Sequence, residues 1–470
     1  MPALPRPTSP IAITLAAALL LASCATAPVP PPPVAAPARF KEDAVWKHAV
    51  GAAAEPVPPD WWRLFDDPVL DGLQRQLAIG NENLKAAVAQ VAGARAALQA
   101  SQAALLPTLS VNGAASRSGG PQAAAGTRGT TASLGLDASW EVDLWGRLSQ
   151  GVTAAGASYQ ASRDDLAAAR LSAQATLVQS YLALRAAEAQ QALLERTAAA
   201  DRRSLELTQA RHAAGVADGS DVLQAQTQLL GVQAQIEDAG LQRAQLEHAI
   251  AVLIGQAPSA FTLARSASLP LLPTVPEFLP STLLEQRPDI AAAERRVAAA
   301  YAQIGVADAA FFPSVTLSAS AGFRGTALAG LLSAPHSLWS LGPALAAAIL
   351  DGGARRQASE QARAAAEQAG SSYRQTVLTA LQEVEDNLAA LERIGAELTL
   401  QQAALQAAQR NQQIVQDQYQ AGTVSYLNVA SAQTATLTAE ASVLSLRNRR
   451  LAAANVLLKN IGGKGPPFHP

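Results

Sequence analysis

The chain has 470 residues, of which 49% are hydrophobic, 15% are charged and only 4% are aromatic, and its formal net charge is -2. This near-neutral balance gives no electrostatic basis for binding nucleic acid, which excludes that class of function. With few aromatic residues and many alanines, the chain is expected to pack through thin seams between helices instead of around one bulky core.

The first 23 residues have the pattern of a secretory signal peptide. One charge, Arg6, precedes an apolar run over 11–21 that is too short to span a membrane. Leu21-Ala-Ser-Cys24 resembles the bacterial lipobox, in which the cysteine is lipidated and becomes the first residue of the mature chain. We therefore expect a covalent lipid on Cys24 and no other cofactor; the alternative is a stray cysteine behind a generic signal peptide. Residue 25 is alanine and not aspartate, which in bacterial lipoproteins favours the outer membrane.

Residues 24–60 are predicted to be a tether. Cys24 is the only cysteine of the chain, which excludes an intramolecular disulfide. Prolines recur behind it, including four in succession over 30–33, and such a segment favours an extended chain without a core. The tether would connect the lipid to the folded part of the protein.

A first structural repeat is predicted over 61–273. Asp67 can cap a helix that begins at Pro68, and a second helical pattern follows over 82–105. Apolar and polar residues then alternate over 109–116, which predicts a first strand, and a loop rich in Gly, Ser and Ala separates it from a second strand.

The second strand, over 131–145, has the clearest pattern in the chain. Every even position from Leu134 to Leu144 is apolar, whereas the odd positions include Asp137, Glu141 and Asp143. A period of two places these sets on opposite faces, as in a strand with lipid on one side and water on the other. Behind it, residues 157–214 contain neither Gly nor Pro and predict a helix roughly 87 Å long.

The same order recurs over 274–463, which leaves 464–470 as a C-terminal tail. Phe311-Phe-Pro-Ser-Val matches Leu105-Leu-Pro-Thr-Leu, and Tyr419-Gln-Ala-Gly matches His212-Ala-Ala-Gly. Two more alternating strands are predicted, with Arg324 in the polar set of the third, followed by a second very long helical region. The chain is therefore a duplication, each half being helix, strand, strand, long helix, turn and helix.

Four membrane strands cannot close a barrel, and open sheet edges are not viable in lipid, so several chains must contribute. Two chains would give eight strands and a filled barrel, and three would give twelve strands and a lumen. We expect an α+β membrane protein with a long α-helical barrel and a transmembrane β-barrel. Side chains facing its lumen would be Asp137, Glu141, Asp143 and Arg324.

Several motifs resemble the TolC-like outer membrane factors, specifically the lipoprotein branch that serves resistance–nodulation–division (RND) efflux pumps. They are Leu21–Cys24, Trp61-Trp-Arg-Leu-Phe-Asp-Asp-Pro68, Ser139-Trp-Glu-Val-Asp-Leu-Trp-Gly-Arg147, Glu285-Gln-Arg-Pro-Asp-Ile290, Leu350-Asp-Gly-Gly353 and Tyr419-Gln-Ala-Gly422. The resemblance implies a homotrimer with twelve barrel strands in outer-membrane lipid. It implies passive export of drugs or other small toxic molecules, delivered by an inner-membrane RND pump through a periplasmic adaptor protein.

The resemblance also implies a gate at the periplasmic tip. The matching positions are Ser220 and Asp221 in the first repeat and Tyr419, Val424, Leu427, Asn428 and Ser431 in the second. Val424 replaces an arginine of some relatives, and Asn428 and Ser431 replace aspartates. We therefore expect a Ser220–Tyr419 hydrogen bond and a ring of Leu427 side chains, with helix capping as the other role of Ser220 and Asp221.

Other interpretations remain open from the sequence. Trp140 and Trp145 fit an interfacial aromatic belt or simple packing at a strand end. The five histidines show no metal-ligand spacing, and no phosphate loop or nucleophile elbow is present, so we expect neither a metal site nor an enzyme. The competing functions are an outer-membrane duct for type I protein secretion and a structural periplasmic coiled-coil lipoprotein.

Overall fold

The computed structural model describes residues 40–41, 58–119, 129–266, 268–275, 286–326 and 329–461. The predicted signal peptide, Cys24, most of the tether and the tail over 464–470 lie outside these residues. The chain divides into two compact units. One contains Gln90–Arg163 and Ala292–Arg374, and the other contains Val34–Ala89, Asp164–Ala291 and Gln375–Pro470.

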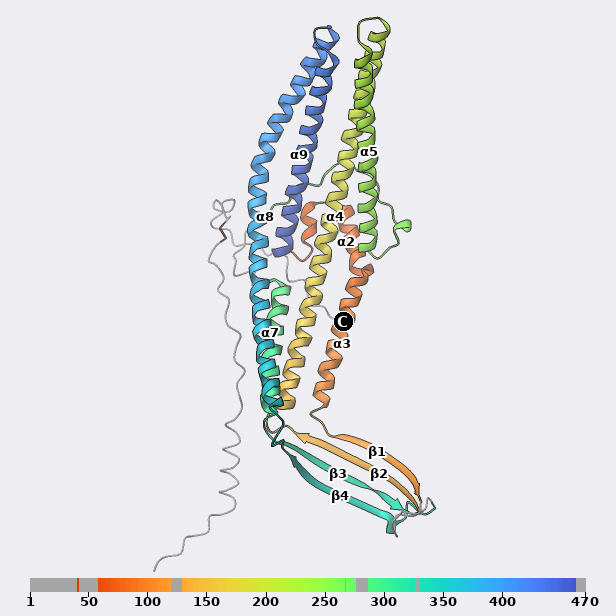
Figure 1. Ribbon diagram of the computed structural model, residues 1–470, viewed down its shortest axis with the longest axis vertical. Coiled ribbons are helices and arrows are strands. Elements are labelled where there is room, and N and C mark those ends of the chain that lie inside the picture. Colours follow the sequence, from red (N-terminus) through yellow and green to blue (C-terminus); the bar gives the residue numbers. More distant parts are fainter. Residues whose placement is uncertain are drawn as a thin grey trace, which may run out of the picture. The chain divides into compact units, whose positions relative to one another are not determined.

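The first unit holds one antiparallel sheet of four strands in the order β1-β2-β3-β4 (Figure 1). The strands are β1 (Thr108–Ser118), β2 (Gly129–Val142), β3 (Ser314–Gly325) and β4 (Ser337–Ala346). All four predicted strands are confirmed. β1 pairs with β2 and β3 with β4 as antiparallel hairpins, and β2 also pairs with β3 along 11 residue pairs. The two repeats are thus joined through one sheet, and β1 and β4 are its edges within this chain.

Each strand of the sheet is joined in the chain to one helix, which precedes β1 and β3 and follows β2 and β4. These helices are α7 (Pro288–Ala309) and the strand-proximal parts of α3 (Glu82–Ala103), α4 (Arg147–Ala213) and α8 (Ala354–Gln420). Asp308 of α7 accepts a hydrogen bond from the Ser359 hydroxyl of α8 at 2.6 Å. Gly305 of α7 lies so close to Gln150 of α4 that a Cβ would approach its side chain to 3.0 Å. These contacts fix α7 between the two long helices.

Helices α4 and α8 have 67 residues each, which corresponds to about 100 Å. Helix α4 begins ten residues earlier than the sequence pattern predicted, because Gly151 and Gly156 lie inside it. Each glycine costs only about 1 kcal/mol in a helix, and a good cap offsets that cost. The start of α4 is therefore set by Asp143, whose carboxylate accepts from the N–H groups of Leu148 and Ser149, and not by the position of the two glycines.

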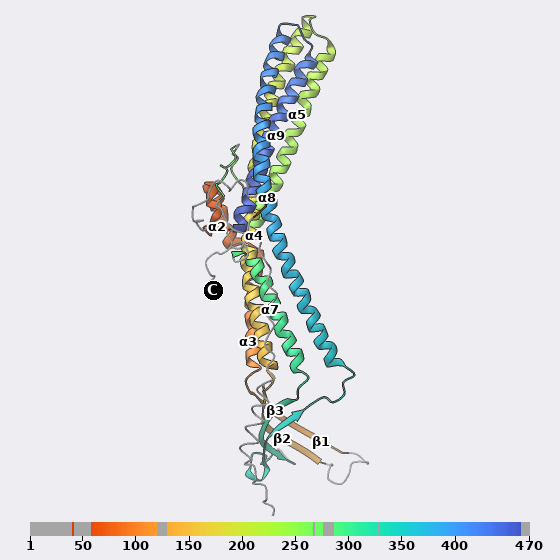
Figure 2. The same ribbon diagram turned by 90° about the vertical axis from the view of Figure 1, so that its left-hand side faces the viewer.

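In the second unit, the long helices turn back at one end and form two antiparallel helical hairpins, α4–α5 and α8–α9 (Figures 1 and 2). The returning helices are α5 (Gly219–Leu253) and α9 (Tyr426–Ile461). Both turns contain a glycine at φ 76°, Gly215 and Gly422. The N–H of Val216 donates to the Arg211 carbonyl at 2.9 Å, and that of Thr423 to the Gln418 carbonyl at 3.0 Å. These matching turns are the left-handed helix ends for which glycine is preferred, and they confirm the predicted turn positions.

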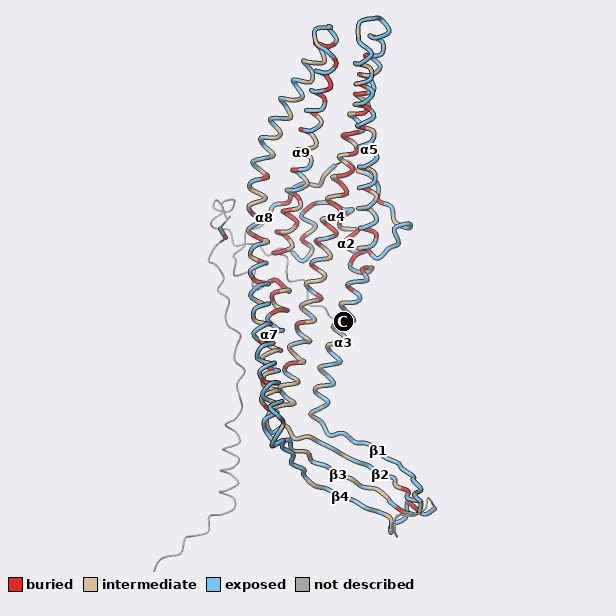
Figure 3. The backbone as a smooth tube through the Cα atoms, in the orientation of Figure 1, coloured by how far each residue is buried: buried red, intermediate tan, exposed pale blue. Residues whose placement is uncertain are grey.

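The core of the second unit surrounds the short elements η3 (Trp61–Phe65) and α2 (Pro68–Gly80). Asp67 caps α2 as predicted, accepting from the N–H groups of Val69 and Leu70 at 2.9 and 3.1 Å. Figure 3 shows buried residues gathered on α2, on the middle of α4 and on α9, whereas the strands are largely exposed. Trp61, Phe65, Leu177, Tyr181, Ile250 and Leu458 are among the core residues. Short 3-10 turns lie at η4 (Pro258–Ala260) and η5 (Ala334–His336).

Gly80 and Gly255 bring α2 onto the end of α5 with direct backbone contact. A Cβ at either position would lie 2.0 Å from a carbonyl oxygen of the other segment, and Gly255 also has φ 75°. Only glycine fits such an approach. No helix within the described residues combines the length and the apolarity needed to cross a bilayer.

Candidate functional site

The sheet has one polar and one apolar face. Asp137 lies opposite Ser110 and Ser320 in the ladder, and Arg324 lies opposite Ser133. Residues directly opposite in an antiparallel pair point to the same face, so Asp137, Glu141 and Arg324 share one face, as predicted. The other face exposes large apolar side chains, among them Leu109, Val111, Leu134, Trp339, Leu341 and Leu345. An exposed apolar surface over a whole sheet marks a face that something apolar covers.

Asp143 and Glu141, two of the acidic residues predicted to face the lumen, form contacts at the start of α4. Asp143 lies beyond the end of β2, so its prediction as a lumen residue is wrong. Its carboxylate accepts from the N–H groups of Leu148 and Ser149 at 3.0 and 2.8 Å and thereby caps α4. Glu141 is still in the strand but forms a bidentate ion pair with Arg147 at 2.7 Å. Among the described residues Asp137 forms no such ion pair; it accepts a hydrogen bond from the Asn112 amide.

The aromatic residues of the same motif fasten the strand end to neighbouring segments. The Trp140 indole donates to the Leu105 carbonyl at 2.9 Å, and that of Trp145 donates to the Pro313 carbonyl at 2.7 Å. Trp145 also stacks on Phe312 with 4.9 Å between ring centroids. Both tryptophans of the 139–147 motif are thus fixed at the end of the strand by hydrogen bonds to backbone carbonyls. The role of Asp143 has a counterpart in the second repeat. There the Asp351 carboxylate accepts from the N–H of Gly353 at 3.0 Å, directly ahead of α8.

At the hairpin tips, Tyr419 is almost completely buried, with 3% of its surface exposed. Its hydroxyl shares a hydrogen bond with Thr208 of α4 at 3.1 Å. The predicted Ser220–Tyr419 bond is not present within this chain, because Ser220 is exposed on the first turn of α5 while Tyr419 points into the seam with α4. Capping by Ser220 or Asp221 is wrong as well, since the N-cap residue of α5 is Asp218.

The remaining tip residues of the second repeat divide into two sets. Val424 packs against a small apolar cluster that contains Ala225, Tyr419, Tyr426 and Val429. Leu427, Asn428 and Ser431 are exposed on one face of α9, with 55% of Leu427 accessible. These three side chains are therefore free to face a lumen or another chain, and Val424 is not.

Asp201 is a buried carboxylate that the sequence analysis missed. It is fully buried on α4, and neither of its oxygens has a hydrogen-bond partner in the part of the chain that the structure describes. Burial raises the pKa of Asp201 to about 6. Burial, with the nearby Asp201 carboxylate as a second cause, also raises the pKa of Tyr426 to about 12. The Asp201 position is recognisable only from the helical period of the buried residues around it.

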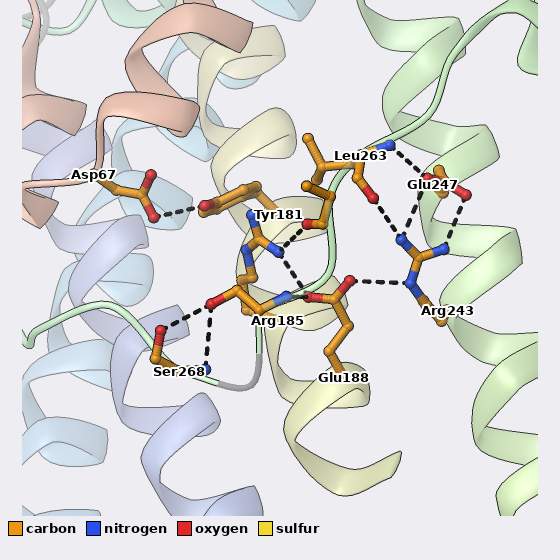
Figure 4. A network of polar contacts seen from close by, with 10 residues as sticks. Asp67, Tyr181, Arg185, Glu188, Arg243, Glu247, Leu263 and Ser268 are labelled. Carbon is orange, nitrogen blue, oxygen red and sulfur yellow. Dashed lines mark hydrogen bonds and ion pairs between the residues drawn. The ribbon is translucent and has the colours of Figure 1, made fainter. Parts of the chain in front are cut away.

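A buried ion network joins α4 to α5 in the second unit (Figure 4). Glu188 accepts from Arg185 at 2.7 Å, from Arg243 at 3.0 Å and from the N–H of Ser266 at 3.0 Å. Arg243 also contacts Glu247 at 3.0 Å, and Tyr181 donates to Asp67 at 2.6 Å. Such fully partnered charges fix the geometry of the helices that carry them.

Arg287, in the motif Glu285-Gln-Arg-Pro-Asp-Ile290, forms a similar cluster. Arg287 contacts Asp289 at 2.6 Å, Glu383 at 3.0 Å and the Asn460 side chain at 2.8 Å. It therefore ties the start of α7 to α8 and α9. Among the described residues, no group of three or more His, Cys, Asp or Glu side chains could hold a metal ion.

Comparison with known proteins places these features in one family. The sequence profile of the outer membrane efflux protein family matches residues 73–256 and 279–463, one segment in each predicted repeat. The pyoverdine export outer membrane protein OpmQ of Pseudomonas aeruginosa is 32% identical over 461 residues, covering 96% of each chain. The solved outer-membrane channel OprN superimposes with a TM-score of 0.84 at 30% identity, over 93% of this chain and 99% of that one. The open state of the MtrE channel of Neisseria gonorrhoeae gives 0.81 at 27% identity, over 93% and 98%.

The duplication, the four-stranded sheet and the long helical hairpins thus have their counterparts in solved channels, and the predicted fold class is confirmed. The chain belongs to the outer membrane efflux protein family.

Proposed function

We propose that this protein is the outer-membrane channel of a tripartite efflux pump. It conducts drugs or other small toxic molecules passively from the periplasm to the exterior. The observation that carries the proposal is the sheet, which has an exposed apolar face, a polar opposite face and two edges that are unpaired within the chain. In lipid, such a sheet is stable only when copies of the chain close it into a barrel.

The proposed assembly is a homotrimer with twelve strands. Asp137 and Arg324 would line its lumen, and the second hairpins would gate its periplasmic end. Three Leu427 side chains, one from each chain, would form an apolar constriction there, supported by their exposure on α9. The proposed partners are a periplasmic adaptor protein and an inner-membrane RND pump, in keeping with relatives that are named as efflux pump outer membrane proteins.

A deletion strain tests this function. Loss of the chain should lower the minimum inhibitory concentration of several unrelated small antimicrobial compounds, and the intact gene should restore it. The protein purified in mild detergent should be a trimer by light scattering. A stable monomer with intact strands by circular dichroism would overturn the channel proposal. Unchanged susceptibility combined with loss of a secreted polypeptide from the medium would instead support the type I secretion duct, and loss of neither would support a structural role.

We further propose that the mature chain begins at a lipidated Cys24, followed by the tether over 24–60. The lipid is an additional anchor, because the barrel itself inserts in the membrane. Cys24→Ala should therefore leave the trimer intact, while mass spectrometry of the wild-type N-terminus should show a diacylglyceryl group on Cys24. A mature protein with a free Cys24 thiol, or with residues 1–23 retained, would contradict the lipidation.

A further inference from the structure

The polar face of the sheet is lined mainly by hydroxyl side chains. Residues directly opposite in the ladder share a face, so the set that contains Asp137 can be followed across all four strands. Its described members include Ser110, Ser133, Ser139, Thr316, Ser318 and Ser340. Hydroxyl groups bind water and carry no charge. The electrostatic potential of this face therefore depends on the few charged side chains among them.

Within the described residues, the charged members of this set are Asp137, Glu141 and Arg324. Glu141 is already neutralised, because it pairs with Arg147 at 2.7 Å. Asp137 and Arg324 are both exposed, and no ion pair with another described residue involves either of them. Each chain thus presents one uncompensated negative charge and one uncompensated positive charge on this face.

Asp137 and Arg324 lie at different levels along the strands. Arg324 is opposite Ser133, which is four residues before Asp137 on β2. At about 3.4 Å per residue, and with the tilt of about 40° that is usual in a barrel, the two levels are about 10 Å apart along the barrel axis. The positions halfway between them are the opposed pair Gly135 and Gly322. On this face, β2 and β3 therefore place no side chain between the two charges.

The two levels also have a defined order. β2 runs from its loop end at Gly129 to Val142, after which the chain continues into α4 (Figure 1). Arg324 is thus the charge near the loop end of the sheet, and Asp137 is the charge nearer to the helices. In the proposed channel, whose helices lie in the periplasm, Arg324 is close to the exterior mouth and Asp137 is deeper in the lumen.

We propose that Asp137 and Arg324 set the ion selectivity of the barrel: three copies of each form two rings of opposite charge, negative toward the periplasm and positive at the exterior mouth. The inference rests on the proposed channel function. A ring of carboxylates favours cations, and a ring of guanidinium groups favours anions. The Debye length at physiological ionic strength, about 8 Å, is shorter than the distance between the rings, so each ring acts separately on passing ions.

The two rings oppose each other, so the barrel discriminates only weakly between cationic and anionic cargo. The four residues predicted from the alternating pattern, Asp137, Glu141, Asp143 and Arg324, would instead have given a lumen with excess negative charge. That excess is removed because Asp143 caps α4 and Glu141 is paired with Arg147.

The ion permeability of the full-length trimer in planar bilayers tests the inference. Every protein compared carries Leu427→Ala, so that the proposed tip constriction does not limit the current. In a KCl gradient near about 0.1 M, Asp137→Asn should shift the permeability ratio of K⁺ to Cl⁻ about twofold toward chloride, and Arg324→Gln about twofold toward potassium. The double variant should return to the reference ratio. In about 1 M KCl the Debye length falls to about 3 Å, and the differences should largely disappear.

The matched control is Arg117→Gln. Arg117 is on β1 near the same loop end, but it lies opposite Thr130 and so belongs to the apolar face; its removal should leave the ratio unchanged. An equal shift in Arg117→Gln and Arg324→Gln would overturn the ring at the mouth.

The outcomes separate this inference from the function on which it rests. If the reference protein conducts while Asp137→Asn and Arg324→Gln both keep its permeability ratio, the rings are wrong and the channel stands. If no protein conducts, the channel function itself fails. Should one of the two variants not assemble, the other decides alone, because each predicts a shift of defined sign.

Discussion

Replacing Glu188 by alanine is expected to destabilise the second unit strongly. Glu188 is 2% exposed and lies between two arginines that are themselves 5% and 10% exposed. Its removal leaves the buried Arg185 without its carboxylate partner and leaves Arg243 with Glu247 alone. Breaking a buried ion pair in this way costs about 3–5 kcal/mol. Thermal unfolding of the purified protein by circular dichroism should show a clear drop in melting temperature together with increased proteolysis.

The control for this experiment is Glu195→Ala. Glu195 is on the same helix, seven residues further along, but it is exposed, and removal of an exposed charge changes stability by well under about 1 kcal/mol. Equal melting temperatures of the Glu188 and Glu195 variants would refute the structural role of the network. Glu188→Gln should fall between them, because glutamine keeps an acceptor for one arginine but no charge.

Replacing Asp201 by leucine or asparagine is expected to stabilise the protein, and only at neutral and alkaline pH. The ordinary pKa of the aspartate is 3.8, and burial raises it to about 6 in the folded chain. Between these values the folded chain holds a proton that the unfolded chain has released, so the free energy of unfolding falls as the pH rises. Above about pH 6 the loss is complete and amounts to roughly 3 kcal/mol.

The apolar surroundings of Asp201 on α4 explain why its charged form is unfavourable, and they determine which substitutions are suitable. Asp201 lies between Ala198 and Leu205 of α4, which belong to or pack against two apolar clusters. The Asp201 carboxylate lies near the Tyr426 phenol of α9 and helps to raise its pKa, whereas the pKa of Asp201 itself is raised by burial. Leucine suits these surroundings, and asparagine keeps the shape of the neutral acid.

Melting temperatures near pH 4 and pH 8 test this prediction. Both Asp201 variants should exceed wild type by several degrees near pH 8, and the asparagine variant should match it near pH 4. Glu206→Gln, an exposed change on the same helix, should differ from wild type at neither pH. A destabilised Asp201→Leu at both pH values would mean that the carboxylate has a stabilising partner.

Much of the architecture could be predicted from the sequence, because it depends on local rules. The period of two in β2 separates Asp137 from Leu134 and Leu136 whatever lies beside the strand. The Gly215 and Gly422 turns are readable because a left-handed residue ends each long helix, and glycine takes that conformation at least cost. The duplication follows from matched motifs alone, and the family profile divides the chain in the same way.

Only the tertiary structure decided how these pieces meet. The alternation of residues along a strand shows which side chains share a face, but it does not show which strand lies beside it. The pairing of β2 with β3 is therefore known only from the structure. Asp143 continues the odd-numbered acidic series, yet it caps α4, because the chain leaves the sheet after Val142 and free helix N–H groups lie next to its carboxylate. Tyr419 bonds to Thr208, 211 residues away, and not to Ser220. The sequence by itself determined periods, turns and repeats, which are properties of neighbouring residues; partners distant in the chain depend on helix packing, which no local pattern encodes.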